Sequence, residues 1–232
     1  MLVLTLYLIV KVHKTITEED KQMYEMLSNN QVTIAGEICS DFIFNHEVFN
    51  EKFYIFDLKV ARLSDAFDII PVVVSERLVD VNTNPIGAIV KVTGQYRSYN
   101  KHEERKNRLV LNVFAREVEA IEDVDCGRES NCINIEGYIC KQPNFRKTPL
   151  GREITDLLVA VNRPYGKSDY IPCISWGRTA RFATTFEVGD RVKISGRIQS
   201  REYYKMIDGK ETKKVAYEVS VAELQLIGEL EE

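Results

Sequence analysis

Polar and hydrophobic residues alternate along residues 191–203, and this period of two predicts a β-strand with one buried face. Val192, Ile194 and Ile198 lie on one side of that strand, because successive side chains of a strand point to opposite faces. The other side carries Arg191, Lys193, Ser195, Arg197, Gln199, Arg201 and Tyr203. A row of cations that ends in a ring is typical of a groove that follows a phosphate backbone. For any single residue, a solubilising charge on an ordinary strand is the alternative.

The rest of the C-terminal half has the same period. It predicts four more strands, over residues 132–140, 153–163, 169–176 and 213–227. Before the last two strands, Phe182, Ala183 and Phe186 have helical spacing, and Gly189 can end that turn. We expect both phenylalanines to lie in the core. Three strands, a short helix and two strands are the order of an OB-fold, a five-stranded Greek-key barrel.

The N-terminal half repeats this pattern at a nearly fixed offset. Residues 32–71 align without a gap on residues 133–172, and residues 87–98 align on residues 189–200. Self-similarity over such a length indicates two copies of one structural unit. We therefore predict an all-β chain of two tandem OB-fold barrels, with one short helix in each.

The expected divisions are an N-terminal extension over residues 1–28, a degenerate first OB domain over 29–125 and a second OB domain over 126–232. The extension begins with MLVLTLYLIV, which has ten apolar or small residues, where a membrane-spanning helix needs about twenty. We therefore expect no membrane anchor. An extra strand or an appended segment is the simpler interpretation, and a secretory signal peptide stays open as an alternative.

Composition favours a binding protein over an enzyme. The five cysteines are odd in number and form no C-x-x-C pair, so neither a disulfide framework nor a zinc site is predicted, and we expect a cytoplasmic protein. None of the common nucleophile, phosphate-loop or zinc-protease motifs occurs. The three histidines, His13, His46 and His102, show no spacing that suggests ligation or general-base catalysis. We expect neither catalysis nor a cofactor.

Charge is distributed unevenly along the chain. The formal net charge of −4 alone argues mildly against a polyanionic partner. Residues 128–217, however, hold 17 Lys and Arg against 10 Asp and Glu, whereas the first 125 residues hold 14 against 20. The second domain is therefore the better candidate for a surface that binds a polyanion.

The predicted strand over residues 169–176 carries the only tryptophan of the chain. Tyr170, Pro172, Ile174 and Trp176 share one of its faces. Because proline cannot donate to a sheet ladder, Pro172 suggests a sheet edge or a bulge. The face with the two rings is a candidate platform for flat ligands.

These residues carry a resemblance to the bacterial single-stranded DNA-binding protein family. The C-terminal half is similar to it in order and spacing, through NCINIEGYICKQPNFRKTPLGREITDLLVAVNR, DYIPCISWGRTA and GDRVKISGRIQSREYY. The N-terminal half resembles the same family more weakly, through NNQVTIAGEIC, KVAR, DIIPVVVS and GAIVKVTGQYRSY. The resemblance implies OB barrels that bind single-stranded DNA without sequence preference.

The resemblance also implies which residues bind. The rings that match the family's base-stacking positions are Tyr165 in a loop, Tyr170, Trp176 and Tyr203. The cations that match its phosphate contacts are Arg163, Arg178, Lys193, Arg197 and Arg201, with Lys205 as a further candidate. Arg163 has a second interpretation, because it ends a strand beside a turn and can pair with Asp169.

The first domain departs from this pattern. Ile69 and Ser75 stand where the second domain has Tyr170 and Trp176, so its stacking platform is predicted to be missing. Its hairpin keeps residues that could hold a strand electrostatically: Tyr96, Arg97, Tyr99, Lys101, Arg105, Lys106 and Arg108.

The expected function is protection of single-stranded DNA in replication, recombination or repair. Because usual members of the family assemble four OB domains, the resemblance implies a homodimer of this chain, with replication proteins as further partners. The alternative is a replication or primosome adaptor that keeps the OB-fold and acts mainly by binding protein.

Overall fold

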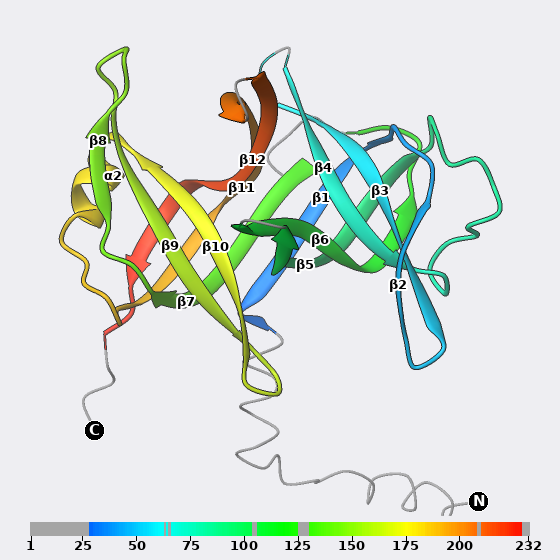
Figure 1. The fold of residues 1–232 in the computed structure, drawn as a ribbon. Coiled ribbons are helices and arrows are strands. Elements are labelled where there is room, and N and C mark those ends of the chain that lie inside the picture. The colour runs from blue at the N-terminus through cyan, green and yellow to red at the C-terminus, as the bar shows by residue number, and fades with distance from the viewer. Residues whose placement is uncertain are drawn as a thin grey trace, which may run out of the picture.

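Two barrels stand side by side in the computed structural model, which describes residues 28–62, 64, 66–103, 106–124, 130–207 and 210–228 (Figure 1). We call residues 30–120 the first half and residues 131–226 the second half. Almost all of the predicted N-terminal extension lies outside the described residues. None of the helices within the described ranges is long and apolar enough to cross a membrane.

Strands make up most of both halves. The first half contains β1 (Asn30–Ile38), β2 (Ile43–Val48), β3 (Glu51–Ala61), β4 (Phe67–Ser75), β5 (Ile89–Glu103) and β6 (Lys106–Ala120). The second half contains β7 (Asn131–Ile139), β8 (Asn144–Lys147), β9 (Glu153–Arg163), β10 (Lys167–Trp176), α2 (Gly177–Ala183), β11 (Arg191–Ile207) and β12 (Lys210–Leu226).

Each half closes on itself as a five-stranded barrel. In the first half the circuit runs β1–β3–β4–β6–β5 and back to β1, and in the second half it runs β7–β9–β10–β12–β11 and back to β7. Only the β4–β6 and β10–β12 contacts are parallel within these circuits. In β10 the parallel pairing begins at Cys173, directly after Pro172, which has no N–H to donate. The all-β prediction and the OB-fold are confirmed.

The inward-facing residues form a hydrophobic cluster that continues through both halves. Ile34 and Leu58 are fully buried in the first half, as are Val159 and Ile194 in the second. Removing such a side chain from water stabilises the fold by about 1.5–3 kcal/mol. The two-residue period of the sequence therefore sets which face of each strand turns into the barrel.

Two glycines allow the long strands to bend. A bulge shifts the register beside Gly94 in β5 and beside Gly196 in β11. An added Cβ would lie 2.1 Å from the Phe114 carbonyl oxygen at the first site and 2.3 Å from the Ser220 carbonyl oxygen at the second. Any side chain there would push the paired strand away, so barrel closure needs glycine at both positions.

The pairing of β1 with β7 joins the barrels into one sheet of 12 strands. Val32 lies opposite Ile133, and the pairing is antiparallel. These two residues occupy the same position in the sequence repeat. The halves are therefore related by a near-twofold axis that passes between Val32 and Ile133, and each presents the same surface to the other.

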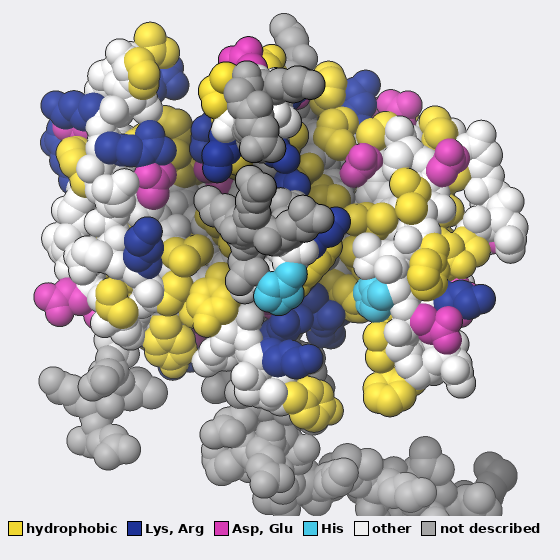
Figure 2. Space-filling view, in the orientation of Figure 1, with side chains coloured by type: hydrophobic (Ala, Val, Ile, Leu, Met, Phe, Trp, Pro, Cys, Tyr) yellow, Lys and Arg dark blue, Asp and Glu magenta, His cyan; other side chains and the backbone are white. Residues whose placement is uncertain are grey.

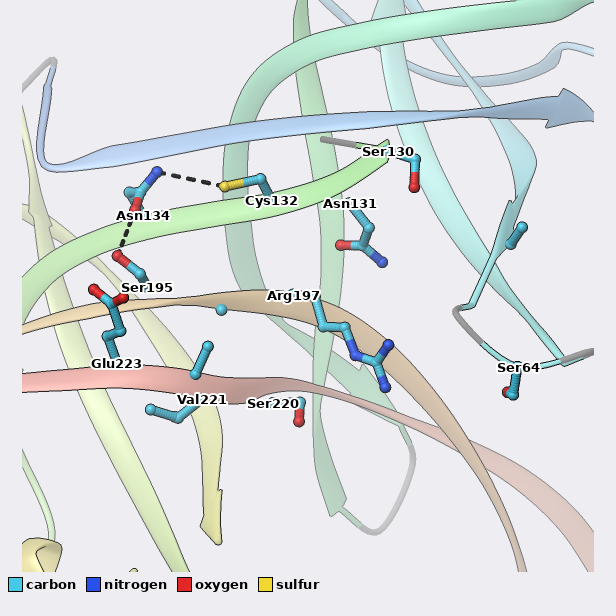
Figure 3. A pocket seen from close by; sticks show the side chains of 13 residues that line it. Ser64, Ser130, Asn131, Cys132, Asn134, Ser195, Arg197, Ser220, Val221 and Glu223 are labelled. Carbon is cyan, nitrogen blue, oxygen red and sulfur yellow. Dashed lines mark hydrogen bonds between the residues drawn. The ribbon is translucent and has the colours of Figure 1, made fainter. Parts of the chain in front are cut away.

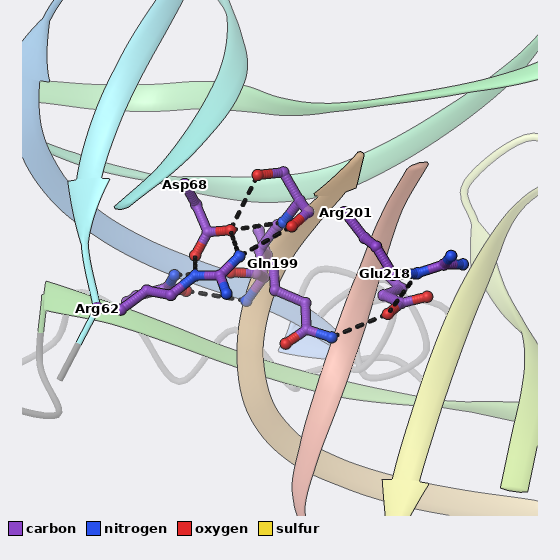
Figure 4. A network of polar contacts seen from close by, with 8 residues as sticks. Arg62, Asp68, Gln199, Arg201 and Glu218 are labelled. Carbon is purple, nitrogen blue, oxygen red and sulfur yellow. Dashed lines mark hydrogen bonds and ion pairs between the residues drawn. The ribbon is translucent and has the colours of Figure 1, made fainter. Parts of the chain in front are cut away.

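Reciprocal hydrogen bonds flank this axis. Asp68 Oδ1 accepts from the Ser200 backbone N–H at 2.6 Å and from the Ser200 hydroxyl at 2.9 Å. In the opposite direction, Asp169 Oδ1 accepts from the Ser98 backbone N–H at 2.6 Å. Both aspartates are fully buried, and each pair of residues is equivalent in the repeat. We call the contact around Asp169 junction A and the contact around Asp68 junction B; Figure 4 shows junction B.

The prediction of a helix in each barrel is wrong for the first half, where residues 76–88 form turns. Asp80 Oδ1 accepts from the Asn82 backbone N–H at 3.0 Å, and Asn84 Oδ1 accepts from the Ile86 backbone N–H at 3.0 Å. Such side-chain bonds compete with helical ones and favour turns, and Pro85 reinforces them. In the second half, Ala180 and Ala183 pack α2 against the barrel.

The two phenylalanines beside α2 differ in burial. Phe186 is 1% exposed, as expected for the core, whereas the expectation for Phe182 is wrong because it is 45% exposed. We predict that Phe186→Ala lowers the free energy of unfolding by about 3–5 kcal/mol. Phe182→Ala removes only an edge-to-face ring contact and is expected to cost about 1 kcal/mol. Urea denaturation of both variants measures this, and similar losses would contradict the assignment.

Junction B gives a second stability prediction. Asp68→Ala leaves the Arg62 guanidinium without its carboxylate and the Ser200 N–H without its acceptor. Breaking a buried pair in this way is expected to cost about 3–5 kcal/mol. Asp41→Ala, at an exposed carboxylate, serves as the control and is expected to change stability by about 0.5 kcal/mol or less. Unfolding midpoints that are equal for the two variants would show that junction B does not hold the halves together.

Candidate nucleic-acid interface

The rings of β10 lie on its outward face. Ile171 and Cys173 point into the barrel and are buried, whereas Tyr170 is 43% exposed and Trp176 is partly exposed. Trp176 ends the strand and stands at the N-cap of α2, with extended backbone angles. The alternation of the strand therefore sets two rings on one surface, about 20 Å apart along the chain.

The cations of β11 share this surface. Ile174 of β10 pairs with Ser220 of β12, and Ser220 pairs with Arg197 of β11. Residues that pair directly across a sheet point to the same side. Arg197 is therefore on the same side of the sheet as Tyr170 and Trp176, with β12 between them. We call this outward surface of β9, β10, β12 and β11 the ring-and-cation face.

Carboxylates already occupy part of that face. Glu218 is 8% exposed, accepts from Gln199 Nε2 at 2.9 Å and lies 3.8 Å from Arg201 Nε (Figure 4). Arg191 pairs with Glu136. In the part of the chain that the structure describes, no such ion pair is formed by Arg178, Lys193 or Arg197. These three cations are therefore available to a polyanion. The carboxylate of Glu218 beside Arg201 was not predicted from the sequence.

Of the remaining predicted rings of the second half, one lies in a turn and one in the hairpin strand β11. Tyr165 is 98% exposed at the tip between β9 and β10, with a left-handed backbone (φ 65°) that ring-bearing residues adopt rarely. Tyr203 is 38% exposed on the β11–β12 hairpin, with the Arg201 guanidinium 5.9 Å from its ring centre. Lys205, further along the same hairpin, is exposed. All three side chains are open to solvent.

Arg163 lies at junction A. Its Nε is 3.2 Å from Asp169 Oδ2, and its side chain is 26% exposed. Asp169 is fully buried, and burial raises the pKa of its carboxyl, while the Ser98 N–H and Arg163 oppose that shift. Of the two interpretations of Arg163, the ion pair with Asp169 is therefore present, and Arg163 stands beside the row of β11 cations rather than within it.

In the first half, Tyr96 is not available for binding. It is 1% exposed, and burial raises the pKa of its hydroxyl well above the usual value. Ile69 is half-buried and Ser75 is buried at the positions that match Tyr170 and Trp176. Arg105 lies outside the described residues. Neither position therefore presents a ring on the outward face of β4.

A pocket of about 870 Å³ opens where the two halves meet beside β11. Its walls present both polar and apolar surface and come from the end of β3, the β3–β4 connection, β7, β11 and β12 (Figure 3). Ser195 Oγ donates to Asn134 Oδ1 at 2.6 Å on one wall, and Arg197 extends from another. Among the described residues, no group of three or more His, Cys, Asp or Glu side chains is arranged to hold a metal ion.

Lys and Arg side chains are concentrated over the second half and the centre of the molecule (Figure 2). The long hairpins of both barrels lie there in Figure 1. Acidic and hydrophobic side chains are visible over both halves of this face.

Comparisons with known proteins agree with this geometry. The model of the Single-strand binding protein family matches residues 130–227. Single-stranded DNA-binding protein B of Bacillus subtilis (strain 168) is 32% identical over 80 residues, which are 32% of this chain and 71% of that protein. Single-stranded DNA-binding protein 3 of Listeria innocua is 31% identical over 100 residues, which are 40% of this chain and 60% of that protein.

The match to the first relatives extends over 50–60% of their own length. Among solved structures, the wild-type single-stranded DNA binding protein from Thermus aquaticus superposes with a TM-score of 0.67 at 19% identity. That superposition covers 86% of this chain and 93% of the other. The likeness therefore includes both halves and shows a shared fold.

Proposed function

Because the chain belongs to the single-strand binding protein family, we propose that it binds single-stranded DNA without sequence preference. The observation that carries the proposal is the ring-and-cation face, where Tyr170 and Trp176 share one side of the sheet with Arg197. A single strand offers flat bases and a regular row of phosphates. The rings can stack on the bases, and the guanidinium groups can pair with the phosphates.

Base stacking supplies the first part of the affinity. Tyr170 and Trp176 offer partly exposed rings on β10, Tyr165 offers one from a turn, and Tyr203 offers one from β11. Stacking on a ring contributes about 1–3 kcal/mol per base and does not depend on which base is present. Duplex DNA keeps its bases stacked on one another, so it cannot use these rings and is expected to bind much more weakly.

Phosphate contacts supply the second part. Arg178, Lys193 and Arg197 are the open cations, and Arg201 is shared with Glu218. Each phosphate that is neutralised releases counterions, so the logarithm of the affinity should fall by about 0.7 per contact for each tenfold rise in salt. Such contacts carry no sequence information.

The biological role follows from this binding. We propose that the chain protects single strands during replication, recombination or repair in the cytoplasm, with replication proteins as further partners. Its relatives are named as single-stranded DNA-binding proteins, which supports a binding role rather than a catalytic one.

The fluorescence of Trp176, the only tryptophan, tests the proposal. Oligo-dT is expected to quench it at low salt, and added salt should reverse the quenching. Tyr170→Ala and Trp176→Ala are each expected to weaken binding by about 1–3 kcal/mol in fluorescence anisotropy, because each removes one stacking surface. Ile69→Ala, at the position in the first half that matches Tyr170, is the control and should bind like the unchanged protein.

Absence of quenching and of binding at low salt would contradict the proposal and favour the adaptor that binds mainly protein. Equal losses for Tyr170→Ala and Ile69→Ala would contradict the assignment of stacking to the rings of β10. Thermal unfolding midpoints of all three variants show whether any loss of binding reflects a loss of folded protein.

We further propose that two chains associate, so that four barrels act together. Static light scattering is expected to give twice the chain mass of 26.7 kDa. A mass that equals one chain, both alone and with a long oligonucleotide, would contradict this.

A further inference from the structure

Junction A carries more positive charge than its single carboxylate can balance. The Arg97 guanidinium is repelled by Arg163 and Arg116 and attracted by Asp169, which also pairs with Arg163. Arg97 Nη2 donates to Gln95 Oε1 at 3.1 Å. The pKa of Arg97 is lowered to about 10, first because burial removes water from its guanidinium and then because Arg163 and Arg116 repel its charge. The Nε atoms of Arg97 and Arg163 are buried and donate no hydrogen bond to any described residue.

Junction B occupies the equivalent place and is balanced. Asp68 accepts from Arg62 through both Nε and Nη2, at 2.9 and 2.5 Å, and also accepts from Ser200. The residue that matches Arg97 in the repeat is Gln199, which donates to Glu218 (Figure 4). The same backbone arrangement therefore carries a second guanidinium group at junction A, where junction B has a neutral amide.

Aromatic side chains continue from Arg97 over the outward face of the first half. The Arg97 guanidinium lies 3.8 Å from the ring centre of Phe114, and the Phe114 and Phe53 ring centres are 5.5 Å apart. His46 stacks on Phe53, with ring centres 4.8 Å apart and planes within 7°. His46 is exposed, so the outer face of its ring is open. We call His46, Phe53, Phe114 and Arg97 the ring stack.

The ring stack belongs to the first half alone. Phe53 pairs with Ser75 as Ile154 pairs with Trp176, so Ile154 is the match of Phe53 in the second half. By the same register Ser220 is the match of Phe114. The ring stack therefore lies on β2, β3, β5 and β6, whereas Tyr170 and Trp176 lie on β10.

Junction A connects the two sets of rings. The Tyr170 backbone N–H donates to Ser98 Oγ at 2.7 Å, and Ser98 directly follows Arg97. Tyr170 thus stands at one side of junction A, and the ring stack begins at the other. From the second half to the first, the order is therefore the Tyr170 ring, the guanidinium groups of Arg163 and Arg97, and the ring stack.

We propose that one DNA strand crosses from the ring-and-cation face over junction A onto the ring stack, with phosphates held by Arg97 and Arg163 and a base stacked on His46. This inference rests on the proposed function. It adds a second binding surface and the path by which the strand reaches it. Both arginine side chains are partly exposed, so phosphate oxygens would accept from their guanidinium groups and offset the excess charge. Junction B has no such excess, so the strand does not cross there.

Arg97→Gln tests this, because it gives junction A the residue that junction B has. A single OB barrel holds about 4–16 nucleotides, so dT of about 10 nucleotides can occupy the second half alone, whereas dT of about 30 can reach both. The unchanged protein is expected to bind the longer oligonucleotide about tenfold or more tightly, because its second contact is intramolecular. Arg97→Gln should lose most of that gain and keep its affinity for the short oligonucleotide.

Two further variants complete the experiment. His46→Ala removes an exposed ring that the fold does not need, and it should also lose the gain for the longer oligonucleotide. Lys91→Gln removes a charge from the same face of β5, about 20 Å from Arg97 along the strand, and should bind both oligonucleotides like the unchanged protein.

The inference is overturned if Arg97→Gln and His46→Ala keep the full gain, or if Lys91→Gln loses as much as they do. In both outcomes binding of the short oligonucleotide still supports the proposed function. If the unchanged protein binds neither oligonucleotide, the proposed function fails together with the inference.

Discussion

The pairing of β1 with β7 is the constraint on which the rest of the structure depends. Its register sets Val32 against Ile133 and so fixes a near-twofold axis between two barrels of one chain. The buried hydrogen bonds from Ser200 to Asp68 and from Ser98 to Asp169 hold the flanks of the same contact. Because these groups are removed from water, neither half can turn against the other without leaving a carboxylate unpaired. The outward faces of both barrels are thereby held in one relative position.

Side chains break the symmetry that the backbone keeps. At junction B, Arg62, Ser200 and Glu218 use nearly all of the available donors and acceptors. At junction A, Arg97 replaces the neutral glutamine and adds a second guanidinium group beside Arg163 and Asp169. A protein of two similar barrels can in this way give a polyanion one preferred crossing. The cost is a desolvated arginine, and the cation–π contact with Phe114 helps to offset it.

Sequence alone could predict the barrels and much of the ring-and-cation face. Alternation along single strands places Tyr170 and Trp176 together and Arg197 on a solvent face, since both are local properties. The ring stack could not be found in this way, because His46, Phe53 and Phe114 come from three strands and meet only through the sheet register. Glu218 of β12 also meets Gln199 and Arg201 of β11 only through the sheet register. The helix expected in the first half does not form, because the Asp80 and Asn84 side chains accept hydrogen bonds from the backbone and stabilise turns there.

The central claim is that one strand occupies the outward faces of both halves on the side of junction A. Photo-cross-linking with a bromodeoxyuridine-substituted oligonucleotide of about 30 nucleotides, followed by peptide mass mapping, tests it most directly. The account predicts adducts both in β10, around Tyr170, and in β2 or β3, around His46 and Phe53. Adducts confined to the second half, or placed around Ile69 at junction B, would contradict it.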